Sequence, residues 1–349
     1  MGVSRRSFVK SLSVWALTAS WPAPLSYAKP LAEFTSVSLS QKPITHFNIS
    51  KPDQKEFANL LFLGGLEFSS SHRQLGGISG ATISPSGDHL LCVTDNGHWV
   101  KAGIKQNATG KPLALENVYI APMLSPTRKA LPGTPLSDIE AITLAPQPGQ
   151  QRLLVSYETA NGILSYPYPL DLTKKPQKIT LPNEIRQLRT NKGLEALAIA
   201  PNQSKFRNHV IAIAERGRSL KVNRPGFILS LNGKLTARFE IDRLGDFDIT
   251  DITFLPSGDM LLLERLFNFQ QGLKMRIRKI KPYEITNGAV IKGSVLLEAD
   301  MGHQIDNMEV ITAHKGIRGE TILTLMSDDN RNFLQRNLLL RFSLSDSKN

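Results

Sequence analysis

One short pattern occurs five times along this chain of 349 residues. Each copy contains a short apolar stretch, a turn rich in Pro and Gly, and a second apolar stretch that ends in an acidic residue. The clearest copy opens with Asp138-Ile139-Glu140-Ala141 and closes with Val155-Ser156-Tyr157-Glu158. Two apolar stretches joined by a short turn predict an antiparallel β-hairpin. The five copies cover residues 77–95, 138–158, 193–215, 249–264 and 306–328.

The copies recur at intervals of roughly 55 to 61 residues, which is enough chain for four strands per unit. Strand-built repeats of this length favour an all-β protein with the β-propeller fold. Five blades can be counted, and a sixth, assembled from residues 30–75 with the C-terminus, stays open. The last unit is short of a strand. We therefore expect Leu60–Phe68 to pair with the C-terminal strand, which closes the ring and removes an exposed sheet edge.

The first residues have the features of an export signal. Ser4-Arg5-Arg6-Ser7-Phe8-Val9-Lys10 is typical of twin-arginine signals, and the apolar stretch Leu12–Ala19 follows it. Cleavage after Ala28 would leave residues 29–349 as a single propeller domain. We therefore expect a periplasmic or secreted protein that meets the twin-arginine translocase during export. No other segment is long and apolar enough for a stable membrane anchor.

The chain is basic, with 42 Lys and Arg against 30 Asp and Glu and a formal net charge of +12. This excess favours anionic partners such as phosphate esters, acidic polymers or an anionic surface. The densest basic run, Lys274–Lys281, alternates with apolar residues and predicts a strand with a solvated basic face. It lacks the interleaved aromatic residues that stack on bases, so nucleic-acid binding is not expected. A monomer is expected.

The acidic residues of the repeat occupy fixed places. In an antiparallel hairpin the start of the first strand lies beside the end of the second strand. If the hairpins are arranged radially, both sets of acids converge on one end of the central axis. The opening acids are Glu140, Glu195, Asp251 and Glu309, with Ser79 in the first copy. The closing acids are Asp95, Glu158, Glu215, Glu264 and Asp328.

So many carboxylates cannot all ionise in a narrow space without compensation. A hard divalent cation such as Ca²⁺ could supply it, because Ca²⁺ takes six to eight oxygen ligands. Basic residues near the acids could also supply it, namely Lys192, Arg216, Arg265 and Arg331. Alternatively, the acids are structural and accept hydrogen bonds from backbone N–H groups of neighbouring blades. The sequence contains no G-x-S-x-G, phosphate-loop, H-E-x-x-H or Cys/His zinc motif.

Several of these segments together resemble the phytase-like family known as "esterase-like activity of phytase". They are Gly76-Gly77-Ile78-Ser79-Gly80, Asp138-Ile139-Glu140-Ala141, Gly193-Leu194-Glu195-Ala196-Leu197, Leu261-Leu262-Leu263-Glu264-Arg265 and Met326-Ser327-Asp328-Asp329-Asn330. The resemblance covers about residues 60–345. It implies a β-propeller and phosphoester hydrolysis, and analogy with propeller phytases implies calcium.

The hypothesis from the sequence is an exported, metal-dependent phosphoric ester hydrolase. Catalysis is assigned to Glu140, Glu195, Asp251 and Glu309. Metal binding is assigned to Asp95, Glu158, Glu215, Glu264 and Asp328. Binding of an anionic small-molecule substrate is assigned to Ser79, Lys192, Arg216 and Arg265. The alternative is a non-catalytic propeller that binds a ligand or a cell-envelope partner.

Overall fold

The computed structural model describes residues 32–345, apart from residues 148, 160, 189–192, 218, 220 and 221. The predicted signal peptide lies outside the described residues, so twin-arginine export stays a prediction. Strands dominate the described part, which contains one four-residue helix, α1 (Asn183–Arg186), and one 3₁₀ turn, η1 (Pro282–Glu284). No helix in this part of the chain is long and apolar enough to cross a membrane.

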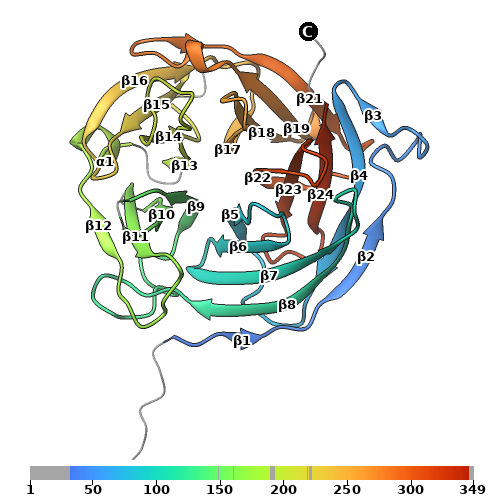
Figure 1. Cartoon of the computed structure of the whole chain (residues 1–349), viewed down its shortest axis with the longest axis horizontal. Coiled ribbons are helices and arrows are strands. Elements are labelled where there is room, and N and C mark those ends of the chain that lie inside the picture. Colours follow the sequence, from blue (N-terminus) through green and yellow to red (C-terminus); the bar gives the residue numbers. More distant parts are fainter. Residues whose placement is uncertain are drawn as a thin grey trace, which may run out of the picture. The chain divides into compact units, whose positions relative to one another are not determined.

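The strands form five sheets around a common axis, and each sheet is one blade of a propeller (Figure 1). Blade 1 contains β5 (Ile78–Ile83), β6 (His89–Thr94), β7 (His98–Gln106), β8 (Pro112–Pro122) and β1 (Thr35–Ser36). Blade 2 contains β9 (Ile139–Ala145), β10 (Arg152–Tyr157), β11 (Gly162–Pro167) and β12 (Gln177–Ile179). Blade 3 contains β13 (Leu194–Ile199), β14 (Val210–Ala214), β15 (Arg224–Leu229), β16 (Leu235–Ile241) and β20 (Val290–Ile291).

Blades 4 and 5 complete the ring. Blade 4 contains β17 (Asp248–Phe254), β18 (Met260–Asn268), β19 (Gly272–Ile280) and β21 (Ser294–Asp300). Blade 5 contains β22 (Asn307–Lys315), β23 (Thr321–Asp328), β24 (Asn337–Leu344), β4 (Leu60–Ser69) and β2 (Ser40–Ile44), with β3 (Glu56–Phe57) paired to β4. The predicted all-β propeller is confirmed, and it has five blades because residues 35–69 join blades 1 and 5 and form no sixth sheet.

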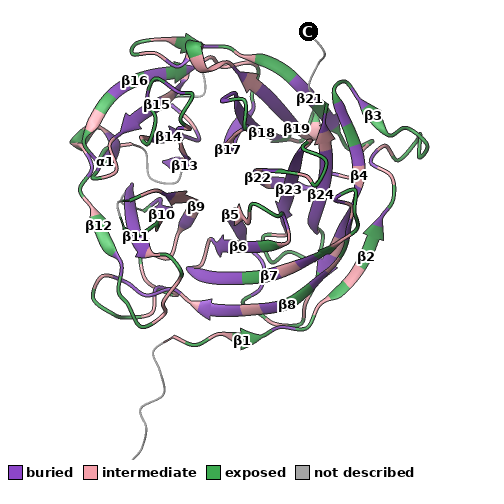
Figure 2. Ribbon diagram, in the orientation of Figure 1, coloured by how far each residue is buried: buried purple, intermediate pink, exposed green. Residues whose placement is uncertain are grey.

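All five repeats form the predicted hairpins, and each hairpin supplies the two innermost strands of its blade. The inner strands β5, β9, β13, β17 and β22 each contact the inner strands of both neighbouring blades. Apolar side chains fill the spaces between blades and form five buried clusters, so most strand residues are buried while turns and outer edges are exposed (Figure 2). Burial between blades is the main stabilising term for such a ring.

The ring closes by pairing the two ends of the domain. Strand β24 is antiparallel to β4, with Asn337 opposite Phe68 and Leu344 opposite Leu60, as predicted (Figure 1). The buried Arg341 of β24 adds a second connection, because its guanidinium donates to the carbonyl oxygens of Gly87 and Gly110 in blade 1. Closure therefore brings β4 and β24 together in blade 5 and connects blade 5 to blade 1.

The basic run Lys274–Lys281 lies in β19 as far as Ile280, so the predicted strand is confirmed, but its predicted solvated face is wrong. The side chains of Arg276 and Arg278 are buried in the middle of blade 4. Both contact Glu264 of the neighbouring strand β18, at 2.7 Å from Arg276 Nε and 2.8 Å from Arg278 Nε. The alternating pattern predicts the strand, but the two arginines lie in the interior of the blade, where both guanidinium groups pair with one carboxylate.

The closing strand pair allows a test of the fold. An added Cβ at Gly65 would lie 2.7 Å from the carbonyl oxygen of Leu339 on β24. We expect Gly65→Ala to lower the free energy of unfolding by about 1–3 kcal/mol, because backbone cannot move aside as a flexible side chain can. The matched control is Gly103→Ala, whose new Cβ would lie 3.3 Å from its nearest neighbour. Urea unfolding measures both, and an equal effect would contradict the close approach at the closure.

Candidate functional site

Each inner hairpin contains a β-bulge near the start of its first strand. We call the end of the propeller at which these five strands start the mouth end. The strand pairing shifts between Ile78 and Gly80, between Leu194 and Ala196, and between Met308 and Val310. A bulge inserts one extra residue and redirects its side chain. In blade 2 the pairing shifts at Ser156 of β10, and in blade 4 it shifts between Ile249 and Asp251 of β17. The bulge positions are therefore Ser79, Glu140, Glu195, Thr250 and Glu309.

The register of blade 4 differs by one residue from the register that the sequence suggests. Its bulge residue is Thr250 and not Asp251. On the next strand, Arg265 pairs with Asp248, just as Asp328 pairs with Asn307 in blade 5. Arg265 therefore takes the place that Asp95, Glu158, Glu215 and Asp328 occupy in the other blades. A shift of one residue in a strand moves each side chain to the opposite face.

This shift explains where the two blade 4 acids lie. Asp251 is buried between β17 and β22, and its carboxylate accepts hydrogen bonds from Ile252 N at 2.8 Å and Ile311 N at 2.9 Å. Asp251 thus accepts hydrogen bonds from backbone N–H groups, which is the structural role that the sequence analysis gave as the alternative to catalysis. Glu264 is held by the two buried arginines of β19. The structure brings neither acid into the group described next, and we do not assign them to catalysis or metal binding.

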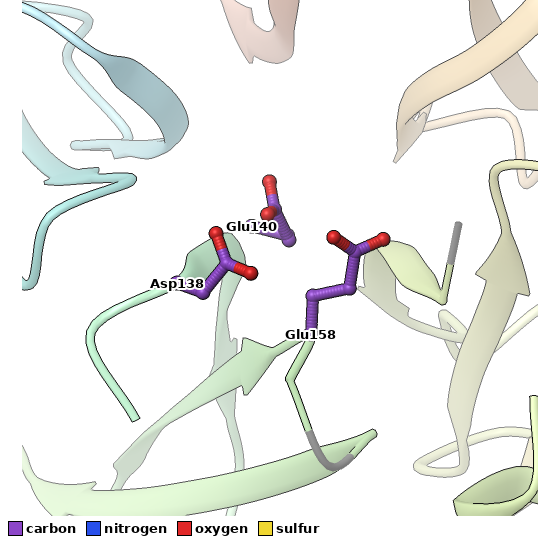
Figure 3. Close-up of side chains that lie close together, drawn as sticks. All are labelled: Asp138, Glu140 and Glu158. Carbon is purple, nitrogen blue, oxygen red and sulfur yellow. The ribbon is translucent and has the colours of Figure 1, made fainter. Parts of the chain in front are cut away.

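Acids of blades 2 and 3 converge at the mouth end. One carboxylate oxygen from each of Asp138, Glu140 and Glu158 lies within 4.8 Å of the other two. The three carboxyl groups point toward one another, from the start of β9 and the end of β10 (Figure 3). The acids Glu158, Glu195 and Glu215 form a second group under the same limit, so that Glu158 belongs to both. These five acids are called the carboxylate cluster below.

A close approach between the two blades positions Glu158. Its Oε1 accepts a hydrogen bond from the backbone N–H of Gly193 at 2.7 Å. A Cβ on residue 193 would lie 1.8 Å from Asn161 Oδ1 and 3.3 Å from Glu158 Cγ, so only glycine fits. The glycine in the third repeat therefore lets an acid of blade 2 reach the inner strand of blade 3.

The electrostatics of the carboxylate cluster oppose full ionisation. Burial raises the pKa of Glu140 well above its ordinary value, and the neighbouring Glu158 and Asp138 raise it further. The pKa of Glu195 is raised well above its ordinary value by burial and then by Glu140 and Glu215. Glu309 of blade 5 also contributes to both shifts, so acids from three blades influence one another. A bound cation would lower these pKa values, because a nearby opposite charge favours the ionised carboxylate.

Arginines at the mouth end pair with acids of blades 1, 4 and 5, and one of them also approaches a member of the carboxylate cluster. Arg265 donates to Glu309 Oε1 at 2.6 Å and lies 3.9 Å from Glu215 Oε1. Arg331, from the loop after β23, contacts Asp95 Oδ1 at 2.5 Å. Arg216 pairs with Asp248, which sequence reasoning did not assign to the site. The predicted substrate ligand Lys192 lies outside the described residues.

Two neutral side chains at the mouth end are also notable. Ser79 Oγ and Asn307 Nδ2 are buried, and neither has a hydrogen-bond partner among the residues that the structure describes. Unpartnered buried polar atoms are uncommon and call for a bound water or ligand group. Ser79 occupies the bulge position that holds a glutamate in blades 2, 3 and 5, as the sequence indicated. Asn307 was not singled out from the sequence.

The site therefore has two unlike sides. In the part of the chain that the structure describes, blades 2 and 3 bring five carboxylates together, which suits a hard cation. Blades 4, 5 and 1 offer the guanidinium groups of Arg265 and Arg331, a hydroxyl and an amide. The sequence places Asp138 two residues before Glu140 and close to the other acids, but the prediction gives it no role at the site. Sequence reasoning could not have found Thr250, whose side chain carries no charge.

The raised pKa of Asp328 predicts the pH dependence of the metal-free protein. Burial and the nearby Glu309 and Asp95 raise the pKa of this carboxyl group from 3.8 to about 7. The folded protein then binds the proton more tightly than the unfolded chain, so stability is present at low pH and is lost as pH rises from about 4 through 7. We expect the melting temperature in chelator to fall by several degrees across this range. Asp328→Asn should reduce the fall, and a melting temperature that instead rises with pH would contradict the assignment.

Comparisons with known proteins agree with this fold. The model of the family "Phytase-like: Esterase-like activity of phytase" matches residues 73–331. No match was found among curated proteins. The solved α-L-arabinofuranosidase of Podospora anserina, in complex with cellotriose, is similar in structure, with 12% identity, a TM-score of 0.50, and coverage of 79% of this chain and 93% of that chain. The α-L-arabinanase of Cellvibrio cellulosa, complexed with arabinohexaose, has 13% identity and a TM-score of 0.42, with coverage of 77% and 92%.

A third similar structure, the WD40 domain of Neurospora crassa Pan2, has 8% identity and a TM-score of 0.38, with coverage of 92% of this chain and 98% of that chain. At 12% identity the likeness to the arabinofuranosidase shows the fold alone, and no conclusion is drawn from the two structures with TM-scores below 0.5. The family match is different in kind, because it spans most of the chain and includes the whole carboxylate cluster. The chain therefore belongs to the phytase-like family described as "esterase-like activity of phytase".

Proposed function

We propose that the chain is a metal-dependent phosphoester hydrolase, with Ca²⁺ bound by the carboxylate cluster of blades 2 and 3. The observation that carries this proposal is the pair of overlapping acid groups that share Glu158. Membership of a phytase-like family supports hydrolysis as the reaction class. The overall positive charge of the chain would favour an anionic substrate.

The donor set suits calcium. Ca²⁺ binds oxygen ligands at about 2.3–2.6 Å, so two oxygens on one ion lie at most about 5 Å apart. The oxygens of each acid group lie within 4.8 Å of one another, which meets this limit. All five residues supply hard carboxylate oxygens, and burial together with the neighbouring acids raises the pKa values of Glu140 and Glu195. Asp138, Glu140, Glu158, Glu195 and Glu215 would hold the metal.

Bound Ca²⁺ would polarise a phosphoryl oxygen and lower the pKa of a water molecule. The residues of the chain would do the rest. Arg265 and Arg331 would attract and orient the phosphate group opposite the carboxylate cluster. Ser79 Oγ and Asn307 Nδ2 are buried polar atoms to which substrate oxygens could bind. Glu309 holds Arg265 in place through its 2.6 Å contact.

An activity assay with a chelator arm tests this proposal. The purified protein is given phosphomonoester and phosphodiester substrates with Ca²⁺ and, separately, with a chelator, beside Glu195→Gln. We expect turnover that Ca²⁺ supports, that the chelator removes, and that Glu195→Gln reduces. Glu298→Gln, an exposed acid on the outer strand β21, is the matched control and should keep full activity. Absence of chelator-sensitive turnover on every substrate would overturn the enzyme assignment and favour a binding propeller.

A further inference from the structure

A cleft lies between blades 2 and 3 at the end of the propeller opposite the mouth end. Its volume is about 340 Å³, which falls in the range of about 300–1,000 Å³ that is typical of small-molecule sites. Blade 2 contributes Ala145, where β9 ends, and Arg152, where β10 begins. Blade 3 contributes Leu231 and Asn232 from the turn between β15 and β16. The cleft is therefore separate from the carboxylate cluster.

Direct contact between the two blades fixes one side of this cleft. A Cβ on Gly233, in the turn of blade 3, would lie 2.4 Å from the carbonyl oxygen of Thr180 and 2.6 Å from Ile179 Cγ2. Glycine lets the two backbones approach so closely. The backbone N–H of Gly233 also donates to Ser230 O at 2.8 Å, which closes the turn. Both walls are held by packing, so a ligand would enter a cleft that already exists.

Arg152 is a positioned cation in this cleft. Its Nε donates to Ser165 Oγ at 2.6 Å and its Nη2 donates to Ser165 O at 2.8 Å. Ser165 is itself buried, so these two hydrogen bonds hold the guanidinium in one orientation. A guanidinium has five N–H groups. The other three have no acceptor among the described residues, and no described carboxylate pairs with Arg152. A planar cation with unused donors suits an oxyanion.

The charges of the lining favour an anion with one negative charge. The lining includes two basic residues, Arg152 and Lys178, and no acidic residue. The ammonium of Lys178 lies 5.9 Å from the centroid of the Tyr157 ring. Tyr157 belongs to the apolar cluster between blades 1 and 2, so Lys178 is turned away from blade 3. Arg152 is then the one cation for a ligand, and a single guanidinium balances a carboxylate better than a doubly charged phosphate.

Neutral side chains complete the lining of the cleft. Asn232 Oδ1 accepts a hydrogen bond from Ser230 Oγ, which leaves the Asn232 Nδ2 group to donate to a ligand. Gln177 supplies a second exposed amide. Leu154 and Leu231 supply apolar surface. Amides recognise hydroxyl groups, and apolar surface suits the C–H groups of a small carbon skeleton.

We propose that this cleft binds a small hydroxycarboxylic acid, of which a sugar acid is representative. The carboxylate would bind Arg152, and hydroxyl groups would bind Asn232 and Gln177. The proposal does not depend on phosphoester hydrolysis at the mouth end, because it rests on residues at the opposite end of blades 2 and 3.

Ligand titration followed by NMR on the isotope-labelled protein tests this proposal. The probes are glucuronate, glucose, which lacks the carboxylate, and inorganic phosphate, all in a buffer freed of divalent cations. The test variants are Arg152→Gln, which removes the cation, and Asn232→Asp, which places a negative charge in the lining at nearly constant size. Arg207→Gln is the matched control, since Arg207 is an exposed arginine in the turn between β13 and β14 and does not line the cleft. Circular dichroism checks that each variant folds.

We expect glucuronate to bind the unchanged protein and Arg207→Gln equally, and glucose and phosphate to bind at least about tenfold more weakly. Arg152→Gln and Asn232→Asp should each weaken glucuronate binding by at least about tenfold, because hydrogen bonds to a charged group are the strong ones. If Arg152→Gln fails to fold, the exposed Asn232→Asp decides. Absence of glucuronate binding would overturn the proposal, as would equal binding by a folded test variant. Tighter binding of phosphate than of glucuronate would overturn the assignment to a carboxylate.

Discussion

Replacing Glu158 with Gln should weaken Ca²⁺ binding by at least about a hundredfold and should abolish calcium-supported turnover. Glu158 is the one acid that belongs to both groups of the carboxylate cluster. A glutamine at this position can still accept the hydrogen bond from Gly193, but it lacks the negative charge that Glu158 contributes to both candidate metal positions. Changes to residues that only support metal ligands already reduce affinity by about 10–100-fold, so loss of a shared ligand should exceed that. Titration calorimetry with Ca²⁺ measures the affinity directly.

Glu116→Gln provides the matched control for this experiment. Glu116 is an exposed glutamate on the outer strand β8, and its change removes the same charge far from the cluster. It should leave Ca²⁺ affinity unchanged. If Glu158→Gln also kept its affinity, the metal would bind elsewhere or not at all, and the acids of blades 2 and 3 would be structural. Because calorimetry needs no substrate, this outcome is separate from the question of activity.

Replacing Glu264 with Gln should lower the free energy of unfolding by about 3–5 kcal/mol. Glu264 is buried between Arg276 and Arg278, which are themselves buried, and it contacts Arg278 at 2.5 Å and Arg276 at 2.7 Å. Removing one partner of a buried ion pair leaves uncompensated charge in the interior, which costs this amount in other proteins. Here two guanidinium groups would share one neutral amide. Urea unfolding monitored by circular dichroism measures the loss.

The exposed pair of Glu184 and Arg238 serves as the control for the buried triad. These side chains also meet at 2.7 Å, but both are in contact with water. Glu184→Gln should therefore leave stability unchanged within error. A triple change of Glu264, Arg276 and Arg278 to Leu, Met and Met should recover much of the loss, because apolar residues can replace a buried charge network. If Glu264→Gln unfolded at the same urea concentration as the unchanged protein, the expected cost of leaving Arg276 and Arg278 without a charged partner would be contradicted.

The sequence predicted most of the fold because the propeller repeats its constraints. Each hairpin consists of apolar strands joined by a turn that contains Pro or Gly. Such hairpins bury their apolar faces by packing against the next hairpin. The pairing of Leu60–Phe68 with the C-terminal strand followed from the need to remove a free edge. The five-blade count did not follow, because residues 35–69 have strand patterns that fit either an extra blade or edge strands of existing ones.

The site was harder to predict because an acid can occupy several places near one strand end. Blade 4 shows the difficulty. Its sequence Asp248-Ile249-Thr250-Asp251 offers two acids, and counting from either gives a plausible repeat. Neither acid lies at the bulge position, which Glu195 occupies in blade 3, because the bulge residue of blade 4 is Thr250. Bulges arise from backbone pairing between strands, and no residue type marks their position reliably.

The sequence by itself determined that this protein is a ring of β-hairpins whose acids collect at one end. Period-two alternation, turn chemistry and the interval between copies are local properties, so they can be read along the chain. Only the tertiary structure decided which acids share space. It grouped Asp138, Glu140, Glu158, Glu195 and Glu215, placed Arg265 opposite them, and enclosed Glu264 between two arginines. Distances between side chains of different blades depend on strand register and blade packing, which no single repeat contains.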